Sequence, residues 1–234
     1  MFYSDCMRFT TFVAFLILSA QCVADSLMSS LQRIESEWAS IYYQTPKAKQ
    51  GEAYQHLLDK TISLSEQFPN KPEPLFWQAV IKATYADHQA ALAALDAIKE
   101  ARDLLLKVIQ MNPKTLDGSA YVTLGTLYYM VPKWPVSFGD DEKAEKMLQT
   151  ALKINPDGID TNYYFGDFLL TTGRPSEAIH YLAKAVKAPA RKEQLFADNQ
   201  LKAEAQNALN KTMAQLKNKE DPVFLSSFNS AGIN

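Results

Sequence analysis

The chain has 234 residues, of which 47% are hydrophobic and 21% are charged, and its formal net charge at pH 7 is -2. This length favours one domain or a repeat array that behaves as one, and the hydrophobic fraction is sufficient for a buried core. The nearly balanced charge argues against a nucleic-acid-binding surface, since such modules usually carry a clustered basic face.

Residues 1–24 have the pattern of a signal peptide. Arg8 precedes an apolar run from Phe9 to Ala20, which is too short for a membrane span of roughly 20 residues. Residues 22–24 form a small-x-small cleavage site. We therefore expect an exported protein, periplasmic or secreted, whose mature chain begins near Asp25 and has no transmembrane span.

Cys22 leaves a second interpretation open, in which this cysteine is lipidated and becomes the first residue of a lipoprotein. Lipoprotein processing requires a small residue just before the cysteine, and Gln21 is not small. Cleavage near Ala24 is therefore favoured over a lipid anchor. Met7, directly before the positive charge, is a more ordinary start than Met1.

The mature chain is expected to open with two helices. Residues 26–44 carry an apolar stripe at helical spacing, and Pro46 follows. A second helix is expected over residues 51–68, ending at Pro69. We interpret residues 26–69 as a degenerate first repeat, because the terminal units of repeat proteins are atypical. The stripe consists of Leu27, Leu31, Ile34, Trp38, Ile41 and Tyr42.

A small-large-small register then occurs three times, each time followed by a proline. The interval from Ala144 to Ala178 is 34 residues, the period of a two-helix repeat, whereas the preceding interval is longer and indicates an insertion. The three copies are Ala101, Leu105, Val108 with Pro113; Ala144, Leu148, Ala151 with Pro156; and Ala178, Leu182, Ala185 with Pro189.

The first half of each repeat carries an aromatic-x-x-Leu-Gly-x-x-Tyr spacing or a weaker form of it. Gly125 and Gly166 are expected where the two helices of a pair cross, because a side chain there would hold the backbones apart. These residues resemble the tetratricopeptide repeat (TPR) family. The copies are Tyr121, Leu124, Gly125 and Tyr128; Asn162, Phe165, Gly166 and Leu169; and the degenerate Trp77, Val80, Ile81 and Thr84.

The TPR resemblance implies an all-α domain over residues 25–218, in which antiparallel helix pairs stack as a right-handed α-solenoid with long N- and C-terminal helices. Its repeats are expected at 74–113, 118–156 and 160–189, followed by a capping helix at 192–217. Residues 219–234 are expected to form a tail, which either docks on the protein or hangs free.

Two insertions differ in kind. Residues 90–95 are rich in alanine, so they are expected to lengthen a helix. Residues 130–139 contain Pro132 and Pro135 and are expected to form a projecting loop, after which Asp140 or Asp141 caps the next helix. In the fourth pair, Asp160 is expected to be the N-cap.

No residue pattern indicates catalysis. The chain has three histidines, on three different expected helix pairs and without the short spacing of a metal site, and it has no glycine-rich phosphate loop or nucleophile elbow. We therefore expect a non-enzymatic protein with no cofactor and no metal. The only basic cluster is interpreted as a solvated face and consists of Lys184, Lys187, Arg191 and Lys192.

The expected binding surface is a concave groove lined by the first helices of the pairs. Its aromatic and hydroxyl character suits a peptide or a moderately apolar small molecule. The alternative is that several of its tyrosines pack against the first helix. The groove candidates are Gln78, Lys82, Tyr85, Val122, Thr126, Tyr129, Tyr163, Asp167 and Leu170.

The loop supplies a second candidate surface through Lys133, Trp134 and Phe138. A tryptophan between prolines costs little entropy to hold as a contact anchor. The alternative, which we favour, is that Trp134 and Phe138 fold back and fill the space that the insertion opens.

With residues 155–158 and 162–170, this loop resembles exported bacterial TPR proteins similar to the T component of TRAP-type solute transporters. That resemblance implies an all-helical periplasmic protein or lipoprotein that partners a solute-binding protein or binds a hydrophobic ligand. We expect an exported, non-enzymatic scaffold that binds a protein or peptide in the cell envelope. The alternative is an accessory component of a TRAP-type transporter that holds a small apolar molecule.

Overall fold

The computed structural model describes the backbone of residues 26–230 and the side chains of residues 26–218. The expected signal peptide, Cys22 and both candidate start residues lie outside this range. Within it the secondary structure is helical, apart from an isolated bridge between Lys133 and Gly139. None of these helices is both long and apolar enough to cross a bilayer.

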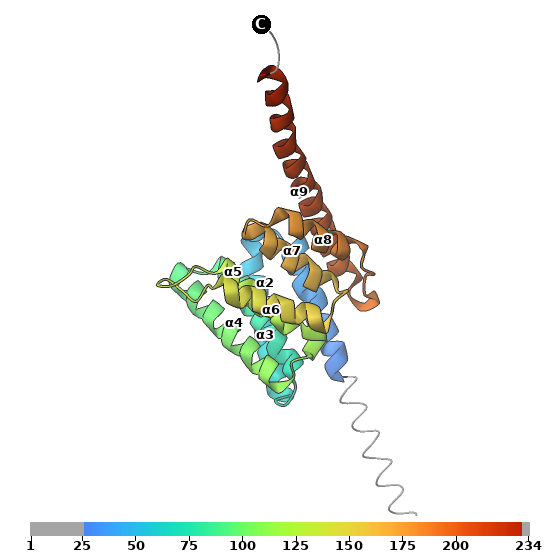
Figure 1. Ribbon diagram of the computed structural model, residues 1–234. Helices are drawn as coiled ribbons and strands as arrows, with labels where there is room; N and C mark the ends of the chain where they lie inside the picture. The colour runs from blue at the N-terminus through green and yellow to red at the C-terminus, as the bar shows by residue number, and fades with distance from the viewer. Residues whose placement is uncertain (1–25, 231–234) are drawn as a thin grey trace, which may run out of the picture.

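The helices follow one another as antiparallel pairs (Figure 1). The first helix, residues 26–44, pairs with α2 through a buried clamp, in which the Gln50 side chain donates to the carbonyls of Ile41, Tyr42 and Thr45. The later elements are α2 (Lys47–Gln67), α3 (Pro72–Tyr85), α4 (Ala91–Met111), α5 (Ser119–Met130), α6 (Asp141–Ile154), α7 (Ile159–Thr171), α8 (Pro175–Lys187) and α9 (Leu195–Ser230).

The repeat register is confirmed by the burial of its residues. Each alanine, leucine and valine of the three copies is 0% exposed. A Cβ added at Gly125 would lie 2.7 Å from Cγ of Leu148, and one at Gly166 would lie 2.9 Å from Cγ of Leu182. Both glycines therefore mark the crossings where α5 meets α6 and α7 meets α8.

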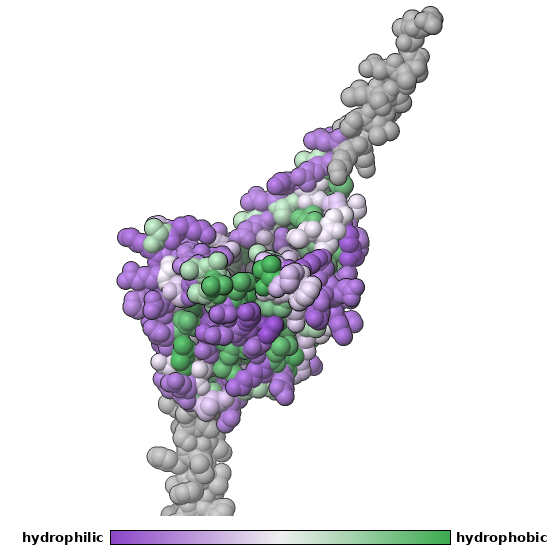
Figure 2. Space-filling model, turned by 90° about the vertical axis from the view of Figure 1, so that its left-hand side faces the viewer, coloured by the Kyte–Doolittle hydropathy of each residue, from purple (hydrophilic) through white to green (hydrophobic). Residues whose placement is uncertain are grey.

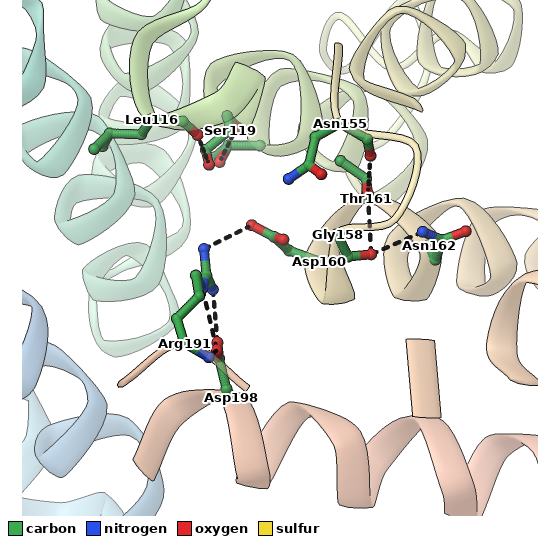
Figure 3. Close-up of polar contacts among 10 residues, drawn as sticks. Leu116, Ser119, Asn155, Gly158, Asp160, Thr161, Asn162, Arg191 and Asp198 are labelled. Atoms are coloured by element: carbon green, nitrogen blue, oxygen red, sulfur yellow. Dashed lines mark hydrogen bonds and ion pairs between the residues drawn. The ribbon is translucent and has the colours of Figure 1, made fainter. Parts of the chain in front are cut away.

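Two helix boundaries depend on caps, of which one was predicted correctly. Asp140 caps α6 by accepting a hydrogen bond from the backbone N–H of Lys143 at 3.0 Å. Asp160 does not cap α7, because it lies inside the helix and Gly158 occupies the cap position. The turn is held instead by Thr161, which donates to the carbonyl of Asn155, and by Asn162, which donates to the carbonyls of Pro156 and Gly158 (Figure 3).

The two insertions have the expected forms, whereas the last helix is longer than expected. Residues 91–95 extend α4, and residues 131–140 form a loop that projects from the stack between α5 and α6 (Figure 1). The backbone of α9 continues to Ser230, so the helix does not end at 217 as predicted, and residues 219–230 of the expected tail are helical. The periodic spacing of apolar residues ends at Leu216, so the sequence pattern does not predict that the helix continues beyond this residue.

Candidate functional site

The first helix lies against the start of α9 and so covers part of the inner face of the repeat stack (Figure 1). The rings of Tyr43 and Phe196 meet edge to face with centroids 6.0 Å apart, and Glu35 and Gln194 line the space beside them. A cleft of about 50 Å³ separates the two helices beside this contact. The two ends of the stack therefore meet, and the predicted open groove is occupied here by the chain itself.

Tyrosines and carboxylates link the helices of this inner face. The Tyr163 hydroxyl donates to Glu204 of α9 at 3.2 Å, and the Glu204 carboxylate adds to burial in raising the pKa of Tyr43 in the first helix. The Tyr129 hydroxyl of α5 donates to Asp167 of α7 at 2.6 Å. Burial raises the pKa of all three phenols and of the Glu204 carboxyl. The phenols are protonated donors at neutral pH, as at the ordinary pKa of tyrosine.

Other groove candidates are directed elsewhere. Val122 is 3% exposed and belongs to the core, so its assignment to the groove is wrong: α5 is apolar around most of its circumference, and the spacing did not separate its two faces. Lys82 pairs with Glu100 of α4 at 2.6 Å. Tyr85 packs beside Gly51 of α2.

The remaining candidates contribute little free surface. Thr126 donates its hydroxyl to the carbonyl of Val122, and Leu170 packs against the core of the later repeats. Gln78 is partly buried. Tyr129, Tyr163 and Asp167 instead join helices to one another, through the Tyr129–Asp167 and Tyr163–Glu204 hydrogen bonds.

A buried ion pair anchors the start of α9. Asp198, which is 1% exposed, accepts hydrogen bonds from the Arg191 guanidinium at 2.6 and 3.1 Å and from the Arg191 backbone N–H at 2.7 Å (Figure 3). Asp160 of α7 lies 3.9 Å from the same guanidinium. The Arg191 side chain of the basic cluster remains 40% exposed, and the buried Asp198 carboxylate holds its guanidinium.

The projecting loop exposes one aromatic ring and packs the other against the core. Phe138 meets Tyr128 edge to face at 5.7 Å, and the Arg102 guanidinium lies 4.6 Å above the Phe138 ring. Trp134 is 85% exposed. The packing interpretation thus holds for Phe138 and is wrong for Trp134, because the single ring of Phe138 already contacts the core.

Several contacts hold the loop against the stack. Lys133 pairs with Asp141 at 2.6 Å, the Gly139 N–H donates to the carbonyl of Pro132, and the Asp140 N–H donates to the carbonyl of Tyr128. Seen from the side on which the loop projects, hydrophobic residues gather in the middle of the face and hydrophilic residues surround them (Figure 2). The exposed apolar side chains of this segment are Met130, Trp134 and Val136.

No family model and no curated protein matches the chain. Among solved structures it is similar to TTC0263, a thermophilic TPR protein of Thermus thermophilus, with a TM-score of 0.53 and 17% sequence identity over 83% of this chain and 96% of that chain. The fold is a TPR solenoid. A second similar structure is MamA 41-end from Desulfovibrio magneticus RS-1, with a TM-score of 0.42 and 16% identity over 82% of this chain and 97% of that chain.

Sequence reasoning missed the residues that bring the two ends of this TPR solenoid together. Tyr43, Glu204 and Asp198 stand in no motif, and Glu35 lies beside the apolar stripe of its helix. The nearest available signal was the pair of adjacent tyrosines, Tyr42 and Tyr43, at the end of an amphipathic helix. Their neighbours are far away in sequence, so the pattern could not identify them.

Proposed function

We propose that this chain is a non-enzymatic TPR scaffold that binds a protein partner through the exposed surface of the loop at residues 130–138. The observation that carries the proposal is the 85% exposure of Trp134 on a loop whose backbone and neighbouring ring are fixed to the stack. Tryptophans of this kind are the commonest energetic anchors of protein interfaces. The partner would offer an apolar pocket that accepts the indole ring.

The inner face is a weaker candidate for the same role. A peptide would have to separate Tyr43 of the first helix from Phe196 of α9 and break the hydrogen bond from Tyr163 to Glu204. The described cleft between the first helix and α9 is about 50 Å³, whereas small-molecule pockets measure roughly 300–1,000 Å³. The TRAP-type alternative with a small apolar ligand therefore receives no support from this cleft.

We further propose that the scaffold acts in the cell envelope. Support comes from the signal-peptide pattern of residues 1–24 and from the absence of cysteine beyond position 22, which suits an oxidising compartment. Mass spectrometry of the protein from the envelope fraction tests this. A free N-terminus near Asp25 supports export by cleavage, an acylated Cys22 indicates a lipid anchor, and an intact N-terminus recovered from the cytoplasm contradicts the proposal.

Trp134→Ala is expected to weaken binding of the partner at least tenfold while changing the free energy of unfolding by no more than about 0.5 kcal/mol, because an exposed side chain contributes little to the fold. A partner captured from envelope extract and then purified would be measured against each variant by calorimetry.

Leu92→Ala is the matched control, because Leu92 is 79% exposed at the start of α4 and outside the loop. It should bind like the parent protein. Unchanged affinity in Trp134→Ala, or equal losses in both variants, would contradict the role of the loop.

A further inference from the structure

The exposed surface of the loop carries both an aromatic anchor and side chains that can receive one. Trp134 is 85% exposed, while Met130 and Val136 of the same segment are 69% and 61% exposed. Methionine is flexible, and its thioether sulfur makes favourable contacts with aromatic rings. A second copy of this surface therefore supplies apolar side chains against which the indole can pack.

The charged groups beside this surface also suit a second copy. Lys133 pairs with Asp141 at 2.6 Å, and both side chains remain exposed, at 63% and 40%. Lys143 pairs with Asp140 at 3.1 Å. When a copy related by a two-fold axis is placed against such a surface, each exposed charge can face an opposite charge. A partner of strong net charge gains little here, because each attraction is accompanied by a repulsion.

The molecule as a whole offers little resistance to contact between copies. Its formal net charge at pH 7 is only -2, so two copies repel each other weakly. The loop projects from the stack between α5 and α6, so two loops can meet without collision between the repeats (Figure 1). The hydrophobic centre and hydrophilic surround of this face match the core and rim of a protein interface (Figure 2).

The size of the surface sets the strength of binding that we expect. A buried aromatic side chain contributes roughly 150–250 Å², whereas a specific interface buries at least about 1,000 Å² in total. Two Trp134 indoles therefore supply less than half of this minimum, and the remaining area has to come from the neighbouring apolar and charged side chains. An interface near the lower limit predicts a dissociation constant on the order of 10 μM.

We propose that the partner of the loop is a second copy of this chain, which binds the first copy about a two-fold axis. The Trp134 indole of each copy packs against Met130 and Val136 of the other. Lys133 of each copy faces Asp141 of the other at the rim. This inference rests on the proposed function, because it names the partner of the same loop.

Sedimentation velocity measures the self-association directly. The protein is used as its expression host delivers it, with a thiol reductant present so that disulfide-linked dimers do not form. The parent protein is expected to show a monomer–dimer equilibrium, and Trp134→Ala should weaken it at least tenfold. Leu92→Ala is the matched control, because Leu92 is 79% exposed and lies outside the loop, and it should associate like the parent.

A charge exchange tests the two-fold arrangement. Lys133→Asp makes the rim acidic and Asp141→Lys makes it basic, so each variant alone should self-associate at least about threefold more weakly than the parent. An equimolar mixture of the two variants should recover the association, because the acidic rim of one then faces the basic rim of the other. Loosening of the loop by either substitution would not be repaired by mixing. A mixture that associates no better than either variant alone overturns the two-fold contact.

The outcomes separate this inference from the proposed function. A parent protein that stays monomeric at 200 μM, about twenty times the expected dissociation constant, overturns the self-association. The same holds if Trp134→Ala associates as strongly as the parent. If the parent is monomeric but binds a different protein and loses it in Trp134→Ala, the proposed function stands and only the identity of the partner is wrong. If Trp134→Ala changes neither form of binding, both proposals fail.

Discussion

Replacing Arg191 with alanine is expected to lower the free energy of unfolding by about 3–5 kcal/mol, as measured by urea denaturation at pH 7. Asp198 is 1% exposed and receives two hydrogen bonds from the Arg191 guanidinium, so the variant leaves a charged carboxylate buried without its counterion. The backbone N–H of residue 191 still reaches Asp198, but one neutral donor does not replace a guanidinium.

Asp198→Ala is the matched control and should cost less, about 1–3 kcal/mol. Arg191 is 40% exposed at its side chain, so its guanidinium turns toward water and Asp160 once Asp198 is removed. A larger loss of unfolding free energy in Arg191→Ala than in Asp198→Ala is what a desolvated carboxylate predicts, whereas an ordinary surface ion pair predicts similar losses. Equal losses in the two variants, or a loss below about 0.5 kcal/mol in Arg191→Ala, would show that the pair behaves as an exposed one.

Gly125→Val is expected to destabilise the protein by about 1–3 kcal/mol through overpacking of the crossing between α5 and α6. An added Cβ would lie 2.7 Å from Cγ of Leu148, which is 0% exposed, and 3.2 Å from the carbonyl of Ala144. Neither the backbone of α6 nor the packed leucine can move away without disturbing the core. The free energy of unfolding from urea titrations measures the effect.

Leu148→Ala supplies the control, because it removes the atoms that the valine would meet. It creates a cavity by itself, yet the double variant should be less destabilised than the sum of the two single variants by about 0.5–3 kcal/mol. If the losses of unfolding free energy in the two single variants simply add in the double variant, the destabilisation by Gly125→Val does not arise from contact with Leu148.

The repeat architecture was predictable because its determinants lie close together in sequence. The register of Ala144, Leu148 and Ala151 fixes which side of α6 is buried, and Gly125 fixes where α5 crosses it. The Asp140 cap and the helical form of residues 91–95 were also predicted correctly, since both depend on neighbouring residues. Local sequence patterns were therefore sufficient to predict the fold.

The closure of the stack was not predictable in the same way. It depends on the curvature that several repeats accumulate, which places Glu35 and Tyr43 beside residues about 160 positions later. The prediction for the loop failed in part because the sequence does not distinguish Trp134 from Phe138, whereas in the structure only Phe138 packs against the core. The candidate site thus depends on contacts between residues far apart in sequence, which a local sequence pattern does not predict.

The length of α9 gives movements at its base a large effect at its far end. Thr212 is the last buried side chain described on this helix, and the backbone remains helical to Ser230, roughly 27 Å further on at 1.5 Å per residue. A tilt of about 10° near Thr212 would displace that end by about 5 Å. The far end of the C-terminal helix therefore moves several times further than its base for any given tilt.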